Sequence, residues 1–191
     1  MFRNQIYKMK NLKITLMAII LALGIKAQAD GLYDITFSDG GANVGFGQIN
    51  VQSGFAIGGY FNVTSGAALG SFSLYTAGGS VAFPGFLPSP GNNFNYNNAV
   101  YLTLNPEFPA TNPFLDGSGL LFTDLTGNEI NLWGNADGSY TFYGVINGIQ
   151  YNPQAIGVST ITPVPEPASL AAITFLLIPV GAFVRKFKFQ S

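Results

Sequence analysis

The sequence contains no cysteine and no histidine, and only 9% of its 191 residues are charged. Without cysteine the chain forms no disulfides, although export would permit them. Without histidine and cysteine it cannot build a Ser-His-Asp triad, a catalytic thiolate, or a zinc or copper site based on these side chains. Any activity or binding must therefore use carboxylates, hydroxyls, amides and aromatic rings.

Cations are missing from most of the chain as well. All Lys and Arg residues lie at or before Lys26 or at or after Arg185, whereas all nine acids lie between these two residues. Residues 27–184 therefore carry a formal charge of −9, which the whole-chain value of −1 conceals. A surface without cations cannot neutralise phosphates, so nucleic acid is excluded as a partner. The same absence excludes side-chain salt bridges and a Schiff-base lysine in this part.

The first 29 residues have the pattern of a secretory signal peptide. A basic segment over residues 1–13 precedes an apolar core over residues 14–25, and Ala27-Gln28-Ala29 follows as a small-x-small cleavage signature. We expect signal peptidase to cut between Ala29 and Asp30. The apolar core is too short to span a bilayer comfortably, and an uncleaved anchor is the alternative.

The other end of the chain carries a second targeting pattern. Val164-Pro165-Glu166-Pro167 leads into an uncharged, mostly apolar run over residues 168–184. At about 1.5 Å per helical residue this run is about 25 Å long, near the lower limit for crossing a bilayer. Arg185, Lys186 and Lys188 then supply a basic stop. These residues predict a Pro-rich stalk (163–167), a transmembrane helix (168–184) and a basic cytoplasmic tail (185–191).

This tripartite tail resembles the PEP-CTERM sorting signal of exosortase substrates. The resemblance is carried by Pro165, Glu166 and Pro167, by the apolar run, and by the basic residues after it. It implies processing near the Pro-Glu-Pro motif by an exosortase, a membrane-embedded cysteine transpeptidase, and a destination at the cell surface or in an extracellular matrix. Such systems accompany exopolysaccharide, which the resemblance therefore suggests as a further partner. A plain C-terminal anchor is the alternative.

The exported part, residues 30–162, has the two-residue periodicity of β-strands. Residues 33–37, 72–75, 100–104 and 140–143 alternate or cluster β-branched and aromatic side chains. Turn-forming pairs separate such segments, among them Gly58-Gly59, Asp137-Gly138 and Asn147-Gly148. We predict one all-β domain, an antiparallel β-sandwich or flattened barrel. Residues 84–113 contain six prolines and should form long loops around one strand, residues 99–104.

Three candidate chemistries can be drawn from the exported domain. Asp124 and Glu129 flank a predicted turn and could face each other as the carboxylate pair of a glycoside hydrolase. Residues 135–139, Asn-Ala-Asp-Gly-Ser, offer oxygen ligands for calcium but lack a downstream bidentate acid, so a simple hairpin turn is favoured. Trp133 and Tyr143 could stack against sugar rings, although core packing is their ordinary role.

Together these patterns predict an exported, non-catalytic protein of the cell surface or extracellular matrix, with no cofactor and no metal. Its precursor is held in the inner membrane by the C-terminal helix, and its partners are signal peptidase and an exosortase. A carbohydrate-binding module of the envelope or matrix is the alternative, and a carboxylate-dependent glycoside hydrolase is a third possibility.

Overall fold

The computed structural model describes residues 30–40, 42–66, 68–150 and 155–165. The predicted signal peptide before Asp30, the transmembrane segment 168–184 and the basic tail 185–191 lie outside the described residues, as do Glu166 and Pro167. Among the residues that are described, there is no helix with the length and apolar character needed to cross a membrane.

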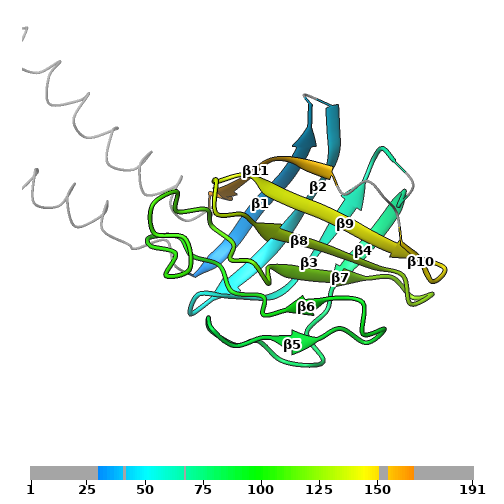
Figure 1. Cartoon of the computed structure of the whole chain (residues 1–191), viewed down its shortest axis with the longest axis horizontal. Helices are drawn as coiled ribbons and strands as arrows, with labels where there is room; N and C mark the ends of the chain where they lie inside the picture. The colour runs from blue at the N-terminus through cyan, green and yellow to red at the C-terminus, as the bar shows by residue number, and fades with distance from the viewer. Residues whose placement is uncertain (1–29, 41, 67, 151–154, 166–191) are drawn as a thin grey trace, which may run out of the picture.

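The described chain is built from antiparallel strands. In chain order they are β1 (Gly31–Asp39), β2 (Ala42–Gln52), β3 (Phe55–Val63), β4 (Gly70–Leu74), β5 (Leu87–Pro88), β6 (Asn95–Tyr96), β7 (Leu120–Thr123), β8 (Glu129–Gly134), β9 (Tyr140–Ile146), β10 (Ile149–Gln150) and β11 (Ala155–Pro163). The main sheet runs β9-β11-β1-β2-β3-β4-β7-β8, and β8 pairs back onto β9. Eight strands thus close into a barrel, with β10 extending β9 as a hairpin (Figure 1). The predicted all-β, antiparallel fold is confirmed, and its form is a barrel.

The barrel interior is filled by the inward side chains of the alternating strands. In β1, Tyr33, Ile35 and Phe37 are buried, whereas Leu32 and Asp34 between them are exposed. The rings of Phe61 on β3 and Phe142 on β9, which lie four strands apart in the closed sheet, have centroids 6.0 Å apart, and the Phe37 ring of β1 stacks on Phe142 at 5.6 Å. The hydrophobic core is therefore the lumen itself, closed by aromatic side chains from opposite walls.

Glycines on β2 make room for these rings. Gly45 pairs with Phe37 on β1, and Gly47 pairs with Phe61 on β3. A Cβ at Gly45 would overlap the Phe61 ring, and a Cβ at Gly47 would overlap the Tyr60 carbonyl oxygen. Small residues here let a narrow barrel hold large aromatic side chains without voids.

One long segment, residues 76–118, leaves the barrel between β4 and β7; we call it the covering loop. Its Val100, Phe114 and Leu115 belong to the main core, and its first half lies against the outside of the barrel. It contains the short β5–β6 pair, which lies beside β7 (Figure 1). Its Phe94 and Tyr96 pack with Leu121 of β7 and Val145 of β9 in a second hydrophobic cluster. The covering loop therefore buries the outer faces of β7, β8 and β9, and β8 is buried on both sides.

The predicted strand over residues 99–104 is wrong. Ala99 forms a single bridge with Phe55, and the segment after it is irregular. Its backbone groups are bonded elsewhere: the Tyr101 N–H donates to the Phe114 carbonyl at 2.8 Å, and Asn112 Nδ2 donates to the Thr103 carbonyl at 2.8 Å. The prolines and asparagines around it replace a ladder with local hydrogen bonds.

The predicted turn at Gly58-Gly59 is also wrong, because both glycines lie inside β3. Gly59 has a φ of 144° and faces Ile49 of β2 across the ladder. A Cβ there would overlap the Gln48 carbonyl oxygen, so this glycine serves the close approach of two strands.

Both ends of the described chain lie at the same end of the barrel, which we call the terminal end. Tyr33 near the start of β1 pairs with Pro163 at the end of β11, and the Val164 N–H donates to the Leu32 carbonyl at 2.9 Å. The Asp30 carboxylate accepts from the Ser53 N–H in the β2–β3 turn at 2.6 Å, which fixes the first described residue to the same end. β11 includes Pro163, the first residue of the predicted stalk.

Candidate functional site

The structure describes three residues of the predicted processing sites. Asp30, the expected new N-terminus, lies at the start of β1 and is bonded to the β2–β3 turn. Val164 is half-buried and bonded to Leu32, and Pro165 is exposed. Ala27, Ala29, Glu166, Pro167, Arg185, Lys186 and Lys188 lie outside the described residues.

The two candidate hydrolase carboxylates have separate structural tasks. The Asp124 carboxylate accepts hydrogen bonds within its own turn from the N–H groups of Thr126 and Asn128 and from both side chains. Partial burial acts to raise the pKa of Asp124, but these hydrogen bonds outweigh it and lower the pKa below its ordinary value. Glu129 pairs across the strands with Thr123 and points outward under the covering loop.

Glu129 is 1% exposed and has no cation beside it among the described residues. It accepts three hydrogen bonds from the covering loop: from the Ser89 hydroxyl at 2.8 Å, the Gly91 N–H at 2.7 Å and Asn93 Nδ2 at 2.8 Å. Bonds of this kind to a carboxylate are stronger than those between neutral groups. The carboxylate thus holds the covering loop on β8 through both of its oxygens.

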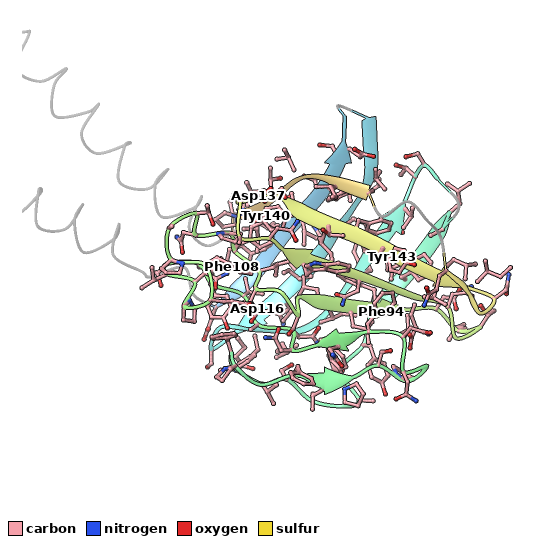
Figure 2. The ribbon with its side chains drawn as sticks, viewed as in Figure 1. Phe94, Phe108, Asp116, Asp137, Tyr140 and Tyr143 are labelled. Carbon is pink, nitrogen blue, oxygen red and sulfur yellow. The ribbon has the colours of Figure 1, made fainter. Side chains whose placement is uncertain are left out.

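A second buried carboxylate, Asp116, organises the other side of the covering loop (Figure 2). One of its oxygens accepts from the N–H groups of Ser118 and Gly119, and the other accepts from Asn97 Nδ2 and the Tyr101 hydroxyl. Burial raises the pKa of Tyr101 to about 12, and the neighbouring Asp116 adds to that shift. Tyr101 is therefore a protonated donor at neutral pH.

Residues 135–139 form a hairpin turn, whose Ala136 carbonyl also accepts from the Thr111 hydroxyl at 3.1 Å. The Asp137 carboxylate accepts from the N–H and the hydroxyl of Ser139, which lowers the pKa of Asp137. Asn135 Nδ2 donates to Ser139 Oγ and to Thr141 Oγ1, both at 2.9 Å. Within the described ranges, no three His, Cys, Asp or Glu side chains gather closely enough to hold a metal ion.

Trp133 and Tyr143, the predicted sugar-stacking pair, lie on the outer faces of β8 and β9. Both are half-buried. Tyr143 packs edge-on against Phe94 of the covering loop, with centroids 5.8 Å apart (Figure 2), and its hydroxyl donates to Gln150. The Phe94 ring thus already covers part of the Tyr143 ring.

The opposite wall of the barrel has an outer surface that the covering loop leaves open; we call it the bare face. It consists of outward side chains on five adjacent strands, β11, β1, β2, β3 and β4. The ladder pairings align them in two rows, one of Thr162, Asp34, Gln48, Tyr60 and Ser73, and one of Thr160, Thr36, Phe46, Asn62 and Ser71. Five strands at about 4.8 Å spacing make this face about 19 Å wide.

The middle of the bare face combines two exposed rings with a fixed polar pair. Phe46 is 45% exposed and Tyr60 is 38% exposed, and the two are diagonal neighbours on β2 and β3. Gln48 lies directly opposite Tyr60, and its Nε2 donates to Asp34 Oδ1 at 2.9 Å. Asp34 is the one charged residue of the two rows.

Neither a family model, nor a curated protein, nor a solved structure matches this chain. The rings, amides and hydroxyls of the bare face can stack and form hydrogen bonds, and Asp34 adds one carboxylate to them.

Sequence reasoning overlooked the bare face although its signal is present. In β1 the polar Asp34 and Thr36 alternate with buried residues, as expected for one solvated face. In β2, however, Phe46 occupies a solvated position between the buried Gly45 and Gly47, and in β3 the exposed Tyr60 lies next to the buried Phe61. The apolar pattern is thus inverted locally, and an aromatic–glycine inversion of this kind marks rings that the core does not use.

Proposed function

We propose that this protein is exported across the inner membrane, held there by its C-terminal segment, and processed by an exosortase to a non-catalytic protein of the cell surface or extracellular matrix. The observation that carries the proposal is the segregation of charge. All cations lie in the terminal segments, and residues 27–184 between them carry a formal charge of −9. Positive residues are retained on the cytoplasmic side, so the pattern favours translocation of everything between them.

The geometry of the barrel supports the same proposal. The chain enters and leaves the barrel at its terminal end, where Asp30 and Val164 lie close to the Leu32–Ser53 region. A domain whose two chain ends lie at the same end can sit on one side of a bilayer while the segments that flank it both remain in the bilayer. Only Val164 and Pro165 separate β11 from Glu166, so the barrel would stand close to the membrane before processing.

The proposal is tested by mapping both ends of the protein in its host. Intact mass and terminal peptides would be measured for the protein from the membrane fraction and from the culture medium. We expect a product that begins at Asp30 and ends upstream of Leu170. A mature protein that keeps the apolar segment would replace sorting with a plain anchor, and a domain found in the cytosol would overturn export itself.

Carbohydrate binding is a second candidate function. It is favoured by the exposed Phe46 and Tyr60 rings on a surface of hydroxyls and amides, and by the absence of cations from the described domain. Trp133 and Tyr143 are the other aromatic pair that such a function could use, although Tyr143 already contacts Phe94. A hydrolase is less well supported, because Asp124 and Glu129 are engaged in a turn and in a buried anchor.

A further inference from the structure

We propose that the bare face is a binding surface for an uncharged polysaccharide chain, which lies across β1, β2 and β3 with sugar rings stacked on Phe46 and Tyr60. The inference rests on the second proposed function, carbohydrate binding, and assigns it a site. That site lies on the wall of the barrel away from the covering loop, and therefore away from Trp133 and Tyr143.

The first argument is the exposure of the two rings. A barrel of this size fills its lumen with Phe37, Phe61 and Phe142, so neither Phe46 nor Tyr60 is needed for the core. Side chains of that size bury a large apolar area wherever they find a partner. The C–H face of a pyranose ring is an apolar partner of matching size, and the two rings at diagonal positions offer two such contacts.

The second argument is the polar pair beside the platform. Gln48 lies opposite Tyr60 on the neighbouring strand, and its amide is held by Asp34 at 2.9 Å. A held amide keeps its carbonyl oxygen and its second N–H in fixed directions, at little further entropic cost on binding. Sugar hydroxyls both donate and accept hydrogen bonds, so an amide beside a carboxylate suits the equatorial edge of a stacked ring.

The third argument is the negative charge of the domain, which distinguishes between possible ligands of the bare face. An anionic polysaccharide, a phosphate-rich polymer or an acidic protein would meet a domain, residues 30–165, that has no Lys or Arg and carries a formal side-chain charge of −8. A second copy of the chain would bring another Asp34 against the first. An uncharged chain meets neither penalty, and its hydroxyls can satisfy the Thr, Ser and Asn side chains of both rows.

Affinity electrophoresis of the full chain purified in a mild detergent tests the proposal. Native gels would contain dextran, soluble starch, hydroxyethylcellulose or galactomannan as uncharged probes, and alginate as an anionic probe. We expect retardation by at least one uncharged polymer, no retardation by alginate, and the same affinity at low and high salt, since no ion pairs form. Phe46→Ala and Tyr60→Ala should each weaken binding about tenfold, the order of magnitude known for removing an aromatic side chain on which a nucleic-acid base stacks.

Two control variants and one stability measurement make the result specific. Leu125→Ala, which shortens a fully exposed apolar side chain in the β7–β8 turn, should bind like the wild type. Tyr60→Phe should keep most of the affinity because it keeps the ring. Unchanged melting temperatures of Phe46→Ala and Tyr60→Ala would show that both still fold, as expected for exposed positions.

The results distinguish a failure of the proposed site from a failure of the proposed carbohydrate binding. If the wild type is retarded but only Trp133→Ala weakens binding, carbohydrate binding stands and the bare face is the wrong site. If no uncharged polymer retards the wild type, both are overturned. Retardation by alginate that disappears in salt, or a loss of self-association in Phe46→Ala in place of a loss of binding, would also overturn the proposal.

Discussion

The Glu129 carboxylate accepts a hydrogen bond from the Ser89 hydroxyl at 2.8 Å, across 40 positions of the sequence. This contact joins Glu129, the first residue of β8, to the covering loop. The Glu129 side chain is buried there and is only 1% exposed. No described residue supplies a cation, so the charge is balanced by three donors alone. The anchor depends on the number and direction of those donors.

Replacing Glu129 by Gln should destabilise the protein by about 1–3 kcal/mol, because the new amide N–H₂ would face at least one of the three donors that the carboxylate now accepts. Urea unfolding measures the free energy, and hydrogen exchange should show faster exchange at the Gly91 N–H. Glu107→Gln is the matched control, since Glu107 accepts from the Gly117 N–H and a Gln oxygen can do the same. Equal stability of E129Q and the wild type would remove Glu129 as an anchor.

Asn98 completes the barrel wall where β4 and β7 barely meet. Its Nδ2 donates to the Tyr75 carbonyl at 2.8 Å, and its Oδ1 accepts from the Leu121 N–H at 3.2 Å. Asn98→Gly should therefore cost about 1–3 kcal/mol, although glycine suits the φ of 53° at this position.

The control for Asn98 is Asn92→Gly, at an exposed asparagine with a φ of 55°. Both substitutions place glycine, which adopts a positive φ without strain, at a position with a positive φ. Only Asn98→Gly also removes the side-chain bridge between Tyr75 and Leu121. Chemical unfolding of both variants measures the difference. A similar gain in stability for both would show that the amide bridge contributes nothing.

Alkaline pH should weaken the fold over a defined window. Burial raises the pKa of Tyr140 from 10.0 to about 12, while its oxygen accepts from the Phe114 N–H at 2.9 Å. The unfolded chain loses this proton near pH 10, whereas the folded chain keeps it to about pH 12. The stabilising effect is thus complete below pH 10 and is lost as the pH rises through 12.

Denaturant unfolding at several pH values measures that slope, and absorbance of tyrosinate follows the titration directly. Tyr140→Phe should flatten the fall in stability above pH 10, and Tyr101→Phe should flatten it further, because burial also raises the pKa of Tyr101 to about 12. If the slope is unchanged in both variants, other groups govern alkaline unfolding.

The sorting motif gives a prediction in cells. Glu166→Gln keeps the size of the side chain but removes its charge, so we expect the full-length tail to accumulate in the membrane fraction if Glu166 is a recognition element. Immunoblotting of membrane and medium measures this. Asp39→Asn, which neutralises an exposed carboxylate at the end of β1, should be processed normally. Normal processing of E166Q would remove Glu166 from recognition.

The sequence predicts the fold best where burial alternates locally. Residues 33–37 and 140–143 lie in β1 and β9 as predicted, and Asp137-Gly138 and Asn147-Gly148 form the turns of two hairpins. These signals depend only on neighbours along the chain, so they need no knowledge of the rest of the molecule.

Features set by distant contacts could not be predicted in this way. Glu129 resembles a solvated turn carboxylate in the sequence, and only the covering loop makes it buried. Gly59 resembles a turn residue, and only the approach of Gln48 shows why it lies inside a strand. Phe46 resembles a core residue in the sequence. The ladder pairs Phe37 with Gly45 and Phe61 with Gly47, which places the core on the other side of β2 from Phe46.

The pairing of β1 with β11 also decides how the barrel responds to mechanical load. Because Tyr33 lies opposite Pro163 and the two strands run antiparallel, tension between the two ends of the domain pulls on the first rung of this ladder and on no other. The hydrogen bonds between β1 and β11 would then break one pair at a time. Shearing the two strands past each other would instead require all of these bonds to break together. A flow or drag force that stretches the domain between its ends would first load the two outermost bonds, Asp30 to Ser53 at one end and Val164 to Leu32 at the other.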